Sequence, residues 1–522
     1  MKMIQYWHQG QRSSEIAELM QSWPDMNPSI SYVLHDRESA VEYLKDRFGS
    51  NLASSFSDIT LPAMASDVFR VAWILCEGGI YVDAATRCLK PIAEWPIDIN
   101  HLVLMRKWHG GICNGLISSP ANHWVLGSIW QSITKVLEQR VDGDIWELTG
   151  PGIFNQILKK VSDSEEEGSI QVVDQQSFST NFQLVNKLDH KKRAHWSRLQ
   201  KVLPLFKLEK TPSQLQYRKT DTLCKCKLVF HIGQHKTGST AIQQAMVRTE
   251  LPDDILYPNT GRKYSGHHGL FDQLRNPKCD IEELTGKLVT EVNASGARTV
   301  VLSSEYFSSQ DELRFDKASA MRIWQRMSYI ANCFSESEVI YYVRSQTEAI
   351  ESRINQAIKS RLCLASVKPR MFMNNPTLDY LVFDEALRYF FPNCLISAVA
   401  YQVDKFPNND ICEDFSNRVE GLILRSRGRA NPPIVNHDAI KECLRINASN
   451  MSVDEKMVAK NSVLSSDDIR SMRDKVSDSF LSQNEIDEIK KQYELSNQLF
   501  AERYPSVGNI QNIPVHYSNS VS

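Results

Sequence analysis

Apolar and polar positions divide the chain into two regions of the same general kind. Over residues 1–206, short apolar runs alternate with stretches in which apolar residues recur at helical spacing, and this alternation starts again at Lys227. Such alternation predicts an α/β domain in each region. Residues 207–226 between them are polar, basic and poor in apolar residues, which predicts a linker. The second domain is expected over residues 227–505, followed by a loose tail at 506–522.

The second region opens with a strand, a turn and a helix. An apolar run at Lys227–Ile232 precedes a glycine-containing turn, and a helical pattern begins at about Thr240. This order is typical of a domain that binds phosphate. A later helical pattern runs from Ser465 to about Arg503, with Ser465 and Ser466 as expected N-caps, so we expect the domain to close with helices. Further strands are predicted at Thr299–Ser303 and Val339–Val343.

Length and composition narrow the choice of function. A chain of 522 residues is too long for one hydrophobic core, so two or three domains are expected. The formal net charge of −2 provides no field that attracts nucleic acid, so no nucleic-acid partner is expected. The eleven cysteines lack zinc-site or redox-motif spacing and indicate reduced thiols. With no apolar run long enough to cross a bilayer and no signal-like start, we expect a cytoplasmic protein. Peripheral contact with the inner face of the membrane stays open.

The turn of the second region carries the strongest chemical signal. Its sequence is Gly-Gln-His-Lys-Thr-Gly-Ser-Thr, from Gly233 to Thr240, between the predicted strand and helix. A turn of this kind directs backbone N–H groups and the positive end of the helix dipole at one point, which makes an anion site. Lys236 adds a point charge, and Ser239 and Thr240 add hydroxyl donors.

The lysine position distinguishes between families of phosphate-binding loop. In a nucleoside-triphosphate P-loop the lysine follows the second glycine, whereas Lys236 precedes Gly238. The run resembles the 5′-phosphosulfate loop of PAPS-dependent sulfotransferases, most closely the bacterial carbohydrate type. The resemblance covers roughly residues 227–420 and the closing Asn497–Tyr504 segment. It implies a P-loop-like α/β fold, PAPS (3′-phosphoadenosine 5′-phosphosulfate) as cofactor, and donor binding by Gly233, Lys236, Thr237, Gly238, Ser239 and Thr240. The alternative is a nucleotide-dependent phosphotransferase.

A second element supports this resemblance. Arg344 follows the predicted strand Val339–Val343, and Ser352 lies eight residues further on in a helical pattern. In the family, an arginine and a serine in these positions hold the 3′-phosphate of the donor, so the resemblance assigns that role to Arg344 and Ser352. The proline that the family often carries two residues after the arginine is Gln346 here.

Sulfuryl transfer requires a base for the acceptor hydroxyl and positive charge on the leaving phosphate. Lys236 fits the second role. For the base we favour Glu305, which follows the predicted strand Thr299–Ser303. His268 and its neighbour His267 are the rival bases, in a polar stretch after the first helix of the domain.

The first region carries two short motifs in order. Ser-Asp-x-x-Arg supplies Asp67 and Arg70, and Gly-Gly-x-Tyr-x-Asp supplies Gly79 and Asp83. Three residues apart, Asp67 and Arg70 share a helix face. Paired glycines permit a tight helix-to-strand turn. Asp83 is expected at a strand end, where open α/β sheets bind ligands.

These motifs resemble glycosyltransferases that carry a DXD sugar-binding motif, including capsular polysaccharide and α-mannosyltransferase-like enzymes. The resemblance spans about residues 1–200. It implies a Rossmann-like GT-A fold and a UDP- or GDP-linked sugar as donor. It also implies a catalytic role for Asp67, and donor binding by Trp7, Asp67, Arg70, Gly79 and Asp83.

The second acidic residue of the motif is absent. Ala85 stands where a full DXD has its second carboxylate. Such a pair normally holds the divalent ion that neutralises the donor diphosphate. We expect Asp83 to hold Mg²⁺ or Mn²⁺, with His195 as the candidate for the missing ligand. The alternative is a degenerate first domain that only binds glycan, attached to a sulfotransferase.

Together the two resemblances predict a bifunctional enzyme of glycan synthesis. It would transfer a sugar from a nucleotide donor, and sulfate from PAPS, to hydroxyls of a capsule, exopolysaccharide or O-antigen type saccharide. The expected partner is this saccharide acceptor, either free or lipid-linked.

Overall fold

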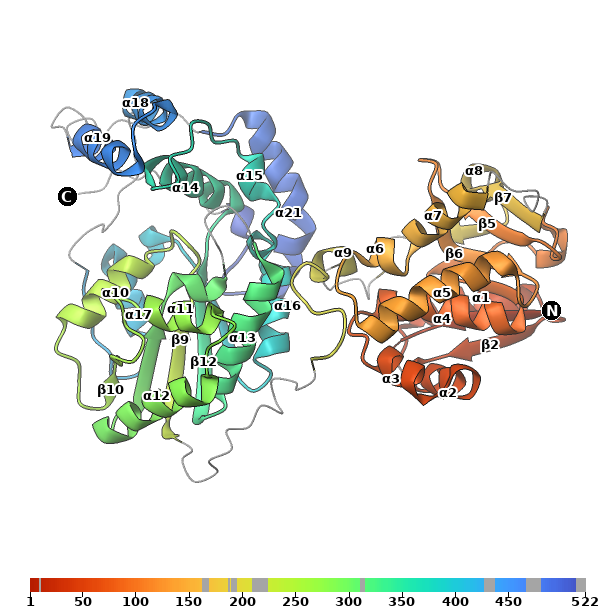
Figure 1. Ribbon diagram of the computed structural model, residues 1–522, viewed down its shortest axis with the longest axis horizontal. Coiled ribbons are helices and arrows are strands. Elements are labelled where there is room, and N and C mark those ends of the chain that lie inside the picture. The colour runs from red at the N-terminus through yellow and green to blue at the C-terminus, as the bar shows by residue number, and fades with distance from the viewer. Residues whose placement is uncertain are drawn as a thin grey trace. The chain divides into compact units, whose positions relative to one another are not determined.

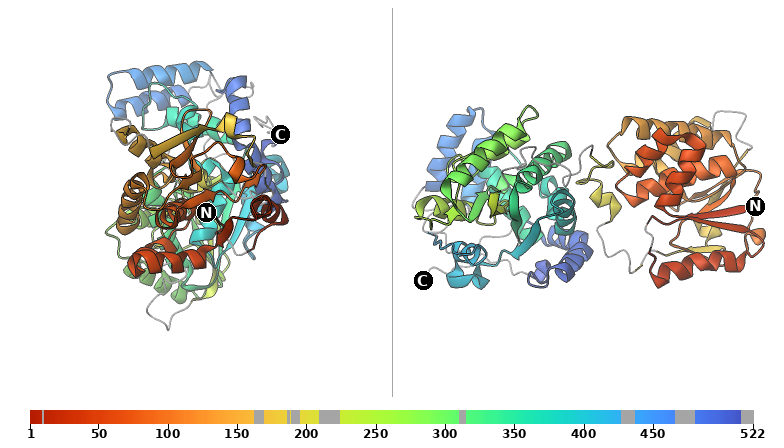
Figure 2. Two further views of the ribbon diagram at one scale, coloured as in Figure 1. Left: turned by 90° about the vertical axis from the view of Figure 1, so that its right-hand side faces the viewer. Right: turned by 90° about the horizontal axis from the view of Figure 1, so that it is seen from below.

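The computed structural model describes residues 1–8, 11–161, 169–185, 188, 195–208, 224–309, 315–426, 437–465 and 480–512. Contacts between residues divide the chain into two compact units, Met1–Glu209 and Lys210–Ser522 (Figures 1 and 2). Each unit combines helices with a sheet that contains parallel strands, so the predicted mixed α/β class is confirmed. Among the helices in these ranges, none combines the length and hydropathy needed to cross a membrane.

The first unit is built on a six-stranded sheet in the order β2-β1-β3-β6-β5-β7. Strands β2, β1 and β3 run parallel, and β6 is antiparallel to β3 and β5. The sheet strands are β1 Lys2–Tyr6, β2 Ser31–His35, β3 Gly79–Val82, β5 Leu102–Arg106, β6 Ile112–Ser119 and β7 Ile170–Asp174; a separate antiparallel pair is β4 Thr86–Cys88 with β8 Phe182–Leu184. The helices are α1 Ser14–Met26, α2 Arg37–Phe48, α3 Ser50–Ser57, α4 Pro62–Glu77, η1 Ile92–Glu94, α5 Trp124–Gln139, α6 Ile145–Leu148, α7 Pro151–Val161, α8 Gln175–Phe178 and α9 Trp196–Leu199.

A glycine pair connects α4 to β3. Gly78 and Gly79 have φ angles of +65° and +99°, a region that side chains disfavour. A Cβ atom on Gly79 would lie 2.3 Å from the carbonyl oxygen of Lys2. Glycine therefore lets the chain leave α4 and enter the sheet beside β1, which places Asp83 at the end of β3.

The second unit contains a five-stranded, fully parallel sheet in the order β10-β11-β9-β12-β13. Its strands are β9 Cys224–His231, β10 Ile255–Leu256, β11 Thr299–Ser303, β12 Phe334–Val343 and β13 Leu395–Ala400. The last three residues expected in the linker belong to β9, because the backbone N–H of Cys224 bonds to the carbonyl of Cys333 and both thiols of the Cys-Lys-Cys run are buried. The segment before it, residues 209–223, lies outside the described part of the chain.

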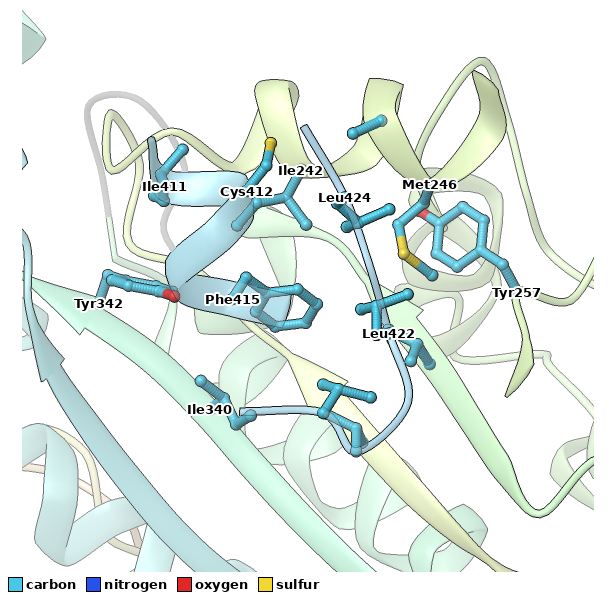
Figure 3. Close-up of a cluster of buried hydrophobic side chains, with 14 of the residues drawn as sticks. Ile242, Met246, Tyr257, Ile340, Tyr342, Ile411, Cys412, Phe415, Leu422 and Leu424 are labelled. Atoms are coloured by element: carbon cyan, nitrogen blue, oxygen red, sulfur yellow. The ribbon is translucent and has the colours of Figure 1, made fainter. Parts of the chain in front are cut away.

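Helices cover both faces of this sheet. Val229, Ile340 and Tyr342 pack with residues of α10 and α17 in one apolar cluster (Figure 3). On the opposite face, Phe230 packs against Phe307 and Phe391, and Tyr341 against Phe383. The helices of this unit are α10 Ser239–Arg248, α11 His268–Arg275, α12 Ile281–Ser295, η5 Glu305–Ser308, α13 Lys317–Ala331, α14 Gln346–Lys359, α15 Arg370–Met373, η6 Pro376–Leu378, α16 Tyr380–Phe390, η7 Val403–Lys405, η8 Pro407–Asn409, α17 Ile411–Ser416, α18 His437–Ala448, α19 Val453–Ser465, α21 Gln483–Arg503 and η9 Ile510–Asn512.

The expected start of the closing helix is wrong. Ser465 is the last residue of α19 instead of an N-cap, and Ser466 lies outside the described residues. Helix α21 begins at Gln483, where Ser482 and Glu485 form a reciprocal capping box. A local Ser-Ser-Asp-Asp run imitates an N-terminal signal, but the residues before it already complete a helix. Of the expected tail, residues 506–512 are described and include η9, whereas 513–522 are not.

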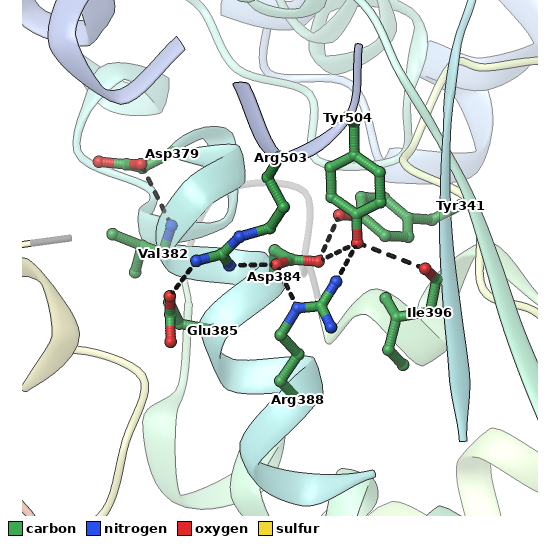
Figure 4. Close-up of polar contacts among 9 residues, drawn as sticks. All are labelled: Tyr341, Asp379, Val382, Asp384, Glu385, Arg388, Ile396, Arg503 and Tyr504. Atoms are coloured by element: carbon green, nitrogen blue, oxygen red, sulfur yellow. Dashed lines mark hydrogen bonds and ion pairs between the residues drawn. The ribbon is translucent and has the colours of Figure 1, made fainter. Parts of the chain in front are cut away.

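A buried carboxylate fastens α21 to the sheet. Asp384 of α16 is fully buried and accepts hydrogen bonds from Arg388, Arg503, Tyr504 and Tyr341 (Figure 4). An unpaired charge in this position would be strongly destabilising, whereas two guanidinium groups and two hydroxyls satisfy it. Arg503 and Tyr504, at the end of α21, are therefore held in the fold of the second unit.

Candidate active sites

In the first unit, Asp67 and Arg70 lie on one face of α4, as their spacing predicts. Their side chains are buried, and Arg70 Nη2 lies 3.3 Å from Asp67 Oδ1. Asn114 of β6 donates a 2.8 Å hydrogen bond to the same oxygen, and its carbonyl accepts one of 2.7 Å from Arg70 Nη1. A helix face and a neighbouring strand thus hold both charged groups in fixed positions.

Asp83 completes this cluster from the end of β3. Its Oδ1 lies 3.2 Å from Arg70 Nη2 and accepts a 2.8 Å hydrogen bond from the Tyr81 hydroxyl. The Asp83 side chain keeps 38% of its surface exposed, in contrast to the buried Asp67. A Cβ atom on Gly115 would lie 2.4 Å from Asp83 Oδ2, so glycine leaves the room that this carboxylate occupies. Arg70 is therefore a cation shared by two carboxylates, one of which faces solvent.

Burial and charge act in opposite directions on these groups. Burial raises the pKa of Asp67 to about 7, although Arg70 and the Asn114 amide oppose the rise. Burial on its own would lower the pKa of Arg70, but Asp83, Tyr81 and Asp67 outweigh it and raise the pKa. The guanidinium is permanently charged, while Asp67 changes its charge close to neutral pH.

Three other predicted residues of this unit lie in different surroundings. Trp7 follows β1 and donates to the carbonyl of Gln11 at 3.1 Å. Gly79 packs against the backbone of Lys2, so the neighbour of this predicted donor-binding residue in the structure is strand β1. His195 caps α9, where its Nδ1 accepts from the Ser197 N–H at 3.3 Å and lies 2.8 Å from the Ser197 hydroxyl.

The position of the missing second carboxylate is partly buried against an apolar cluster. Ala85 and Trp7 both pack against a cluster that includes Ile16, Leu19 and Ala84. Within the part of the chain that the structure describes, no three His, Cys, Asp or Glu side chains form a metal-binding group. In the described cluster of Asp67, Arg70 and Asp83, the carboxylate that faces solvent is that of Asp83. Its Oδ1 already contacts the Arg70 guanidinium.

In the second unit, parallel strands bring three predicted elements to one sheet edge. The central strand β9 leads into the Gly233–Gly238 loop, while its neighbours β11 and β12 lead into Glu305 and Arg344. Because all three strands run parallel, their carboxyl ends meet at the same edge, where ligands of open α/β sheets bind. Strand order thus explains why residues over a hundred positions apart are neighbours.

The loop conformation depends on left-handed residues. Gly233, Lys236 and Gly238 have φ angles of +44°, +70° and +78°. A Cβ atom on Gly233 would lie 2.4 Å from the Ser239 hydroxyl, and one on Gly238 would lie 2.7 Å from Ile411. The Ser239 hydroxyl is buried and has no hydrogen-bond partner among the described residues. A buried hydroxyl without a protein partner, at a helix N-terminus behind a glycine, is an arrangement that suits an anion site.

The other two hydroxyls of the loop differ from each other. The buried Thr237 hydroxyl donates to the carbonyl of Gln234 at 2.7 Å, so it stabilises the turn itself. Thr240 lies in the first turn of α10 and is exposed.

Lys236 and Arg344 are linked through the loop backbone. The carbonyl of Lys236 accepts a 2.9 Å hydrogen bond from Arg344 Nη1. The Arg344 guanidinium also lies over the ring of Tyr401, 5.5 Å from its centroid, and its Nε is 3.4 Å from Glu348 Oε2. The two predicted phosphate ligands therefore occupy one connected site.

One face of α14 lines this site. Lys236 Nζ donates to Gln356 Oε1 at 3.4 Å, and Glu348 of the same helix contacts Arg344. Ser352 lies four residues from each of these contacts, so helical geometry places it on the same face. Lys359 follows one turn after Gln356, and burial together with the charge of Lys236 lowers its pKa to about 8.

Glu305 lies against the loop. A Cβ atom on Gly233 would be 3.4 Å from its Cα, and Gln243 of α10 donates a 2.8 Å hydrogen bond to Glu305 Oε2. Burial on its own would raise the pKa of Glu305, but His235, the Gln243 amide and His268 outweigh burial and lower it. The carboxylate is therefore ionised at neutral pH and able to accept a proton.

The two rival histidines have different roles. His267 is buried; its Nδ1 accepts from the Ser303 N–H at 3.1 Å, and its Nε2 lies 3.0 Å from the carbonyl of Pro258. This arrangement requires a neutral ring, and burial lowers the pKa of His267 to about 4. His268 instead begins α11, with Nδ1 2.9 Å from the Ser304 hydroxyl and its ring edge-on to Tyr306. Its position is next to the Glu305 segment.

Sequence reasoning missed three residues of this centre: His235, Gln243 and Lys359. His235 adjoins Lys236 in the chain and packs edge-on against Tyr306 at 5.2 Å. Gln243 is four residues after the orphaned Ser239, so helical spacing alone could have predicted that it lies on the loop-facing side of α10. Lys359 had no local signal, because only the contact between α14 and the loop reveals it.

Comparison with known proteins finds glycosyltransferase relatives for the first unit. The family model described as "Glycosyltransferase sugar-binding region containing DXD motif" matches residues 13–101. These residues resemble a known sugar-binding region. The match includes Asp67, Arg70 and Asp83, whereas Trp7 and His195 lie outside it.

Two curated relatives are similar to part of the chain. The "Initiation-specific alpha-1,6-mannosyltransferase" of Candida albicans is 27% identical over 177 residues, which is 26% of this chain and 46% of that protein. The protein of the same description from Schizosaccharomyces pombe is 31% identical over 174 residues, covering 28% of this chain and 44% of that protein. The chain thus spans less than half the length of these relatives.

Likeness to solved structures is weak. "PaToxG Glycosyltransferase" has a TM-score of 0.26 and 17% identity, covering 31% of this chain and 68% of that chain. "Sulfotransferase Domain from the Curacin Biosynthetic Pathway" has a TM-score of 0.26 and 12% identity, covering 52% of this chain and 99% of that chain.

Proposed function

We propose that the second unit transfers a sulfuryl group from PAPS to a saccharide hydroxyl. The observation that carries this proposal is the loop between β9 and α10, in which the orphaned Ser239 hydroxyl lies at the N-terminus of α10 and Arg344 is bonded to the backbone carbonyl of Lys236. Such a site suits a ligand with two separated anionic groups, as in a 3′,5′-bisphosphorylated adenosine. Ser352 and Lys359 on the adjoining face of α14 extend the polar surface for it.

The residues around the loop have separate roles in this reaction. Glu305, ionised and fixed by Gln243, takes the proton from the acceptor hydroxyl as its oxygen forms a bond to sulfur. The bond between sulfur and the bridging phosphate oxygen breaks, and the ammonium group of Lys236 offsets the charge left on that phosphate. His268, next to the Glu305 segment, is the alternative base.

Replacement of Glu305 by glutamine tests this assignment. Glu305→Gln keeps the shape and the Gln243 contact but removes the base, so transfer of ³⁵S-labelled sulfate should fall about 10²- to 10⁴-fold with donor binding retained. Glu250→Gln, an exposed residue of the same unit, serves as the control. Unchanged transfer by Glu305→Gln, with transfer lost in His268→Gln, would assign the base to His268.

We also propose that the first unit transfers a sugar from a UDP- or GDP-linked donor to a saccharide, with mannose as the first candidate. The charged cluster of Asp67, Arg70 and Asp83 supports this proposal, as do the match to the DXD family model and the two mannosyltransferase relatives. The exposed part of Asp83 is the group available to a donor or its Mg²⁺ or Mn²⁺ ion. The residues present fit such an ion only with help from water and the donor diphosphate, because a second carboxylate is absent.

Donor hydrolysis tests the first unit. GDP-mannose and a panel of UDP-sugars are incubated with the full chain, with and without EDTA, and nucleotide release is measured. Asp83→Asn should abolish release, whereas Asp46→Asn, an exposed residue of α2, should retain it.

A second candidate is a first unit that binds glycan without catalysis. The apolar surroundings of Ala85 favour it, because they leave one solvent-facing carboxylate in the described cluster. Saccharide binding with no nucleotide release from any sugar donor would select this alternative.

For the whole protein we propose glycan synthesis in the cytoplasm. All eleven cysteines are free thiols, in agreement with a reducing compartment.

A further inference from the structure

A cleft opens beside the Glu305 segment and has a volume of about 470 Å³. This size is within the range of pockets that hold small ligands. Residues of α11, η5 and the start of α13 line it, together with Lys263 and Tyr264 of the loop before α11.

Two lining residues of the cleft adjoin the proposed sulfuryl-transfer centre. His268 and Tyr306 both line the cleft. The Tyr306 ring lies edge-on to His268 at 5.1 Å and to His235 at 5.2 Å, and both histidines lower the pKa of Glu305. The cleft wall therefore contains His268, the alternative base, and Tyr306, which follows Glu305 in the chain.

Aromatic rings form much of the lining. Phe271 and Tyr306 lie with their planes only 30° apart and their centroids 5.3 Å apart. Tyr264 is 87% exposed at a φ of +59°, so its ring contributes to surface rather than to core. Flat apolar surfaces next to polar groups suit a pyranose ring, whose C–H face packs on aromatic carbon while its hydroxyls form hydrogen bonds.

The charges along the cleft offset each other. Lys263 Nζ lies 3.6 Å from Asp272 Oδ2, and Arg275 and Asp316 are further charged residues of the described lining, besides His268. Apart from His268, the described lining thus holds two cations and two anions, which provide little of the excess positive charge that a uronic acid or an already sulfated sugar would require. The carboxylates are instead acceptors for sugar hydroxyls.

We infer that this cleft binds the sulfate acceptor, and that the acceptor residue is an uncharged hexose. This inference rests on the proposed sulfuryl transfer and adds the substrate class to it.

Binding is tested first, independently of turnover. The full chain is saturated with adenosine 3′,5′-bisphosphate and mixed with a mannan tetrasaccharide, a dextran tetrasaccharide or a heparosan tetrasaccharide, and saturation-transfer difference NMR is recorded. Signal from a neutral tetrasaccharide, lost in Tyr264→Ala, is the expected result. Signal from heparosan alone would overturn the assignment of an uncharged acceptor.

Kinetics then locate the site. Tyr264→Ala and Asp272→Asn should each raise the acceptor KM about tenfold with the affinity for adenosine 3′,5′-bisphosphate unchanged. Ile423→Ala, which removes an exposed apolar side chain of the same unit, should leave KM unchanged. If the wild-type chain binds the bisphosphate and sulfates the acceptor but both cleft variants keep the wild-type KM, the cleft assignment is wrong while sulfuryl transfer stands. If the wild-type chain does not bind the bisphosphate, the proposed function itself fails.

Discussion

The side-chain amide of Gln243 donates a 2.8 Å hydrogen bond to Oε2 of Glu305. Gln243 belongs to α10, the helix whose N-terminus carries the orphaned Ser239 hydroxyl. One helix therefore presents its positive end to the proposed donor site and, one turn later, fixes the proposed base. This arrangement couples the positions of the anion and the base.

Loss of this hydrogen bond should move the pH dependence of sulfuryl transfer. Gln243 lowers the pKa of Glu305, so Gln243→Leu should raise that pKa, and the base should be lost to protonation at higher pH than in the wild type. The acidic limb of the kcat profile should shift upward, while Gln244→Leu on the same helix should leave it in place. A profile that does not move in Gln243→Leu would show that Glu305 is not the titrating base.

Lys359 should make donor-site binding sensitive to alkaline pH. Its pKa of about 8 in the free protein means that it loses its charge as the pH rises past that value. An anion favours the protonated form, so affinity for adenosine 3′,5′-bisphosphate should fall between pH 7 and pH 9. Lys359→Met should flatten this dependence, and Lys368→Met, an exposed control, should retain it. Identical slopes in both variants would exclude Lys359 from the anion site.

Asp67 should make the first unit less stable as the pH rises. Its folded pKa is about 7 against 3.8 for the ordinary group, so between these values the folded state holds a proton that the unfolded state has lost. The free energy of unfolding should therefore fall with rising pH across this window, by at most about 1.4 kcal/mol per pH unit. Hydrogen exchange of α4, corrected for intrinsic rates, should report this slope in the full chain. Asp67→Asn should remove it and Asp46→Asn should not; a slope that persists in Asp67→Asn would disprove the assignment.

Restoring the second carboxylate should cost stability. In Ala85→Asp the new charge would lie against the apolar cluster of Ile16, Leu19 and Ala84, and we expect a loss of about 1–3 kcal/mol. Thermal unfolding should show a lower Tm, and added Mn²⁺ should not recover it. A variant as stable as the wild type with a Mn²⁺-dependent rise in Tm would mean that the site accepts the full metal-binding pair.

The sequence pattern predicted the arrangement of strand ends better than the contacts of single side chains. The apolar runs predicted three strands followed by the loop, Glu305 and Arg344, and the parallel pairing of these strands brings their ends together. The neighbours Gln243 and Lys359 did not follow, because packing between helices and the loop decides those contacts. The cleft beside Tyr264 likewise arises from three elements distant in sequence.

Predictions of helix and strand ends from local sequence were wrong where packing with distant segments sets the end. Ser465 carries the residue type of an N-cap but ends α19, and the strand expected at Lys227 starts at Cys224 because it pairs with β12. In the first unit, helical spacing correctly placed Asp67 beside Arg70. That Arg70 also contacts Asp83 depends on the glycine turn between α4 and β3, and the apolar surroundings of Ala85 depend on α1.

The most direct measurement is calorimetric titration of the full chain with adenosine 3′,5′-bisphosphate in EDTA. The account predicts metal-free binding that is lost in Lys236→Ala and retained in Lys278→Ala, an exposed lysine of the same unit. Absence of binding to the wild-type chain, or binding of ATP with Mg²⁺ in its place, would contradict the proposal that this loop holds the sulfate donor.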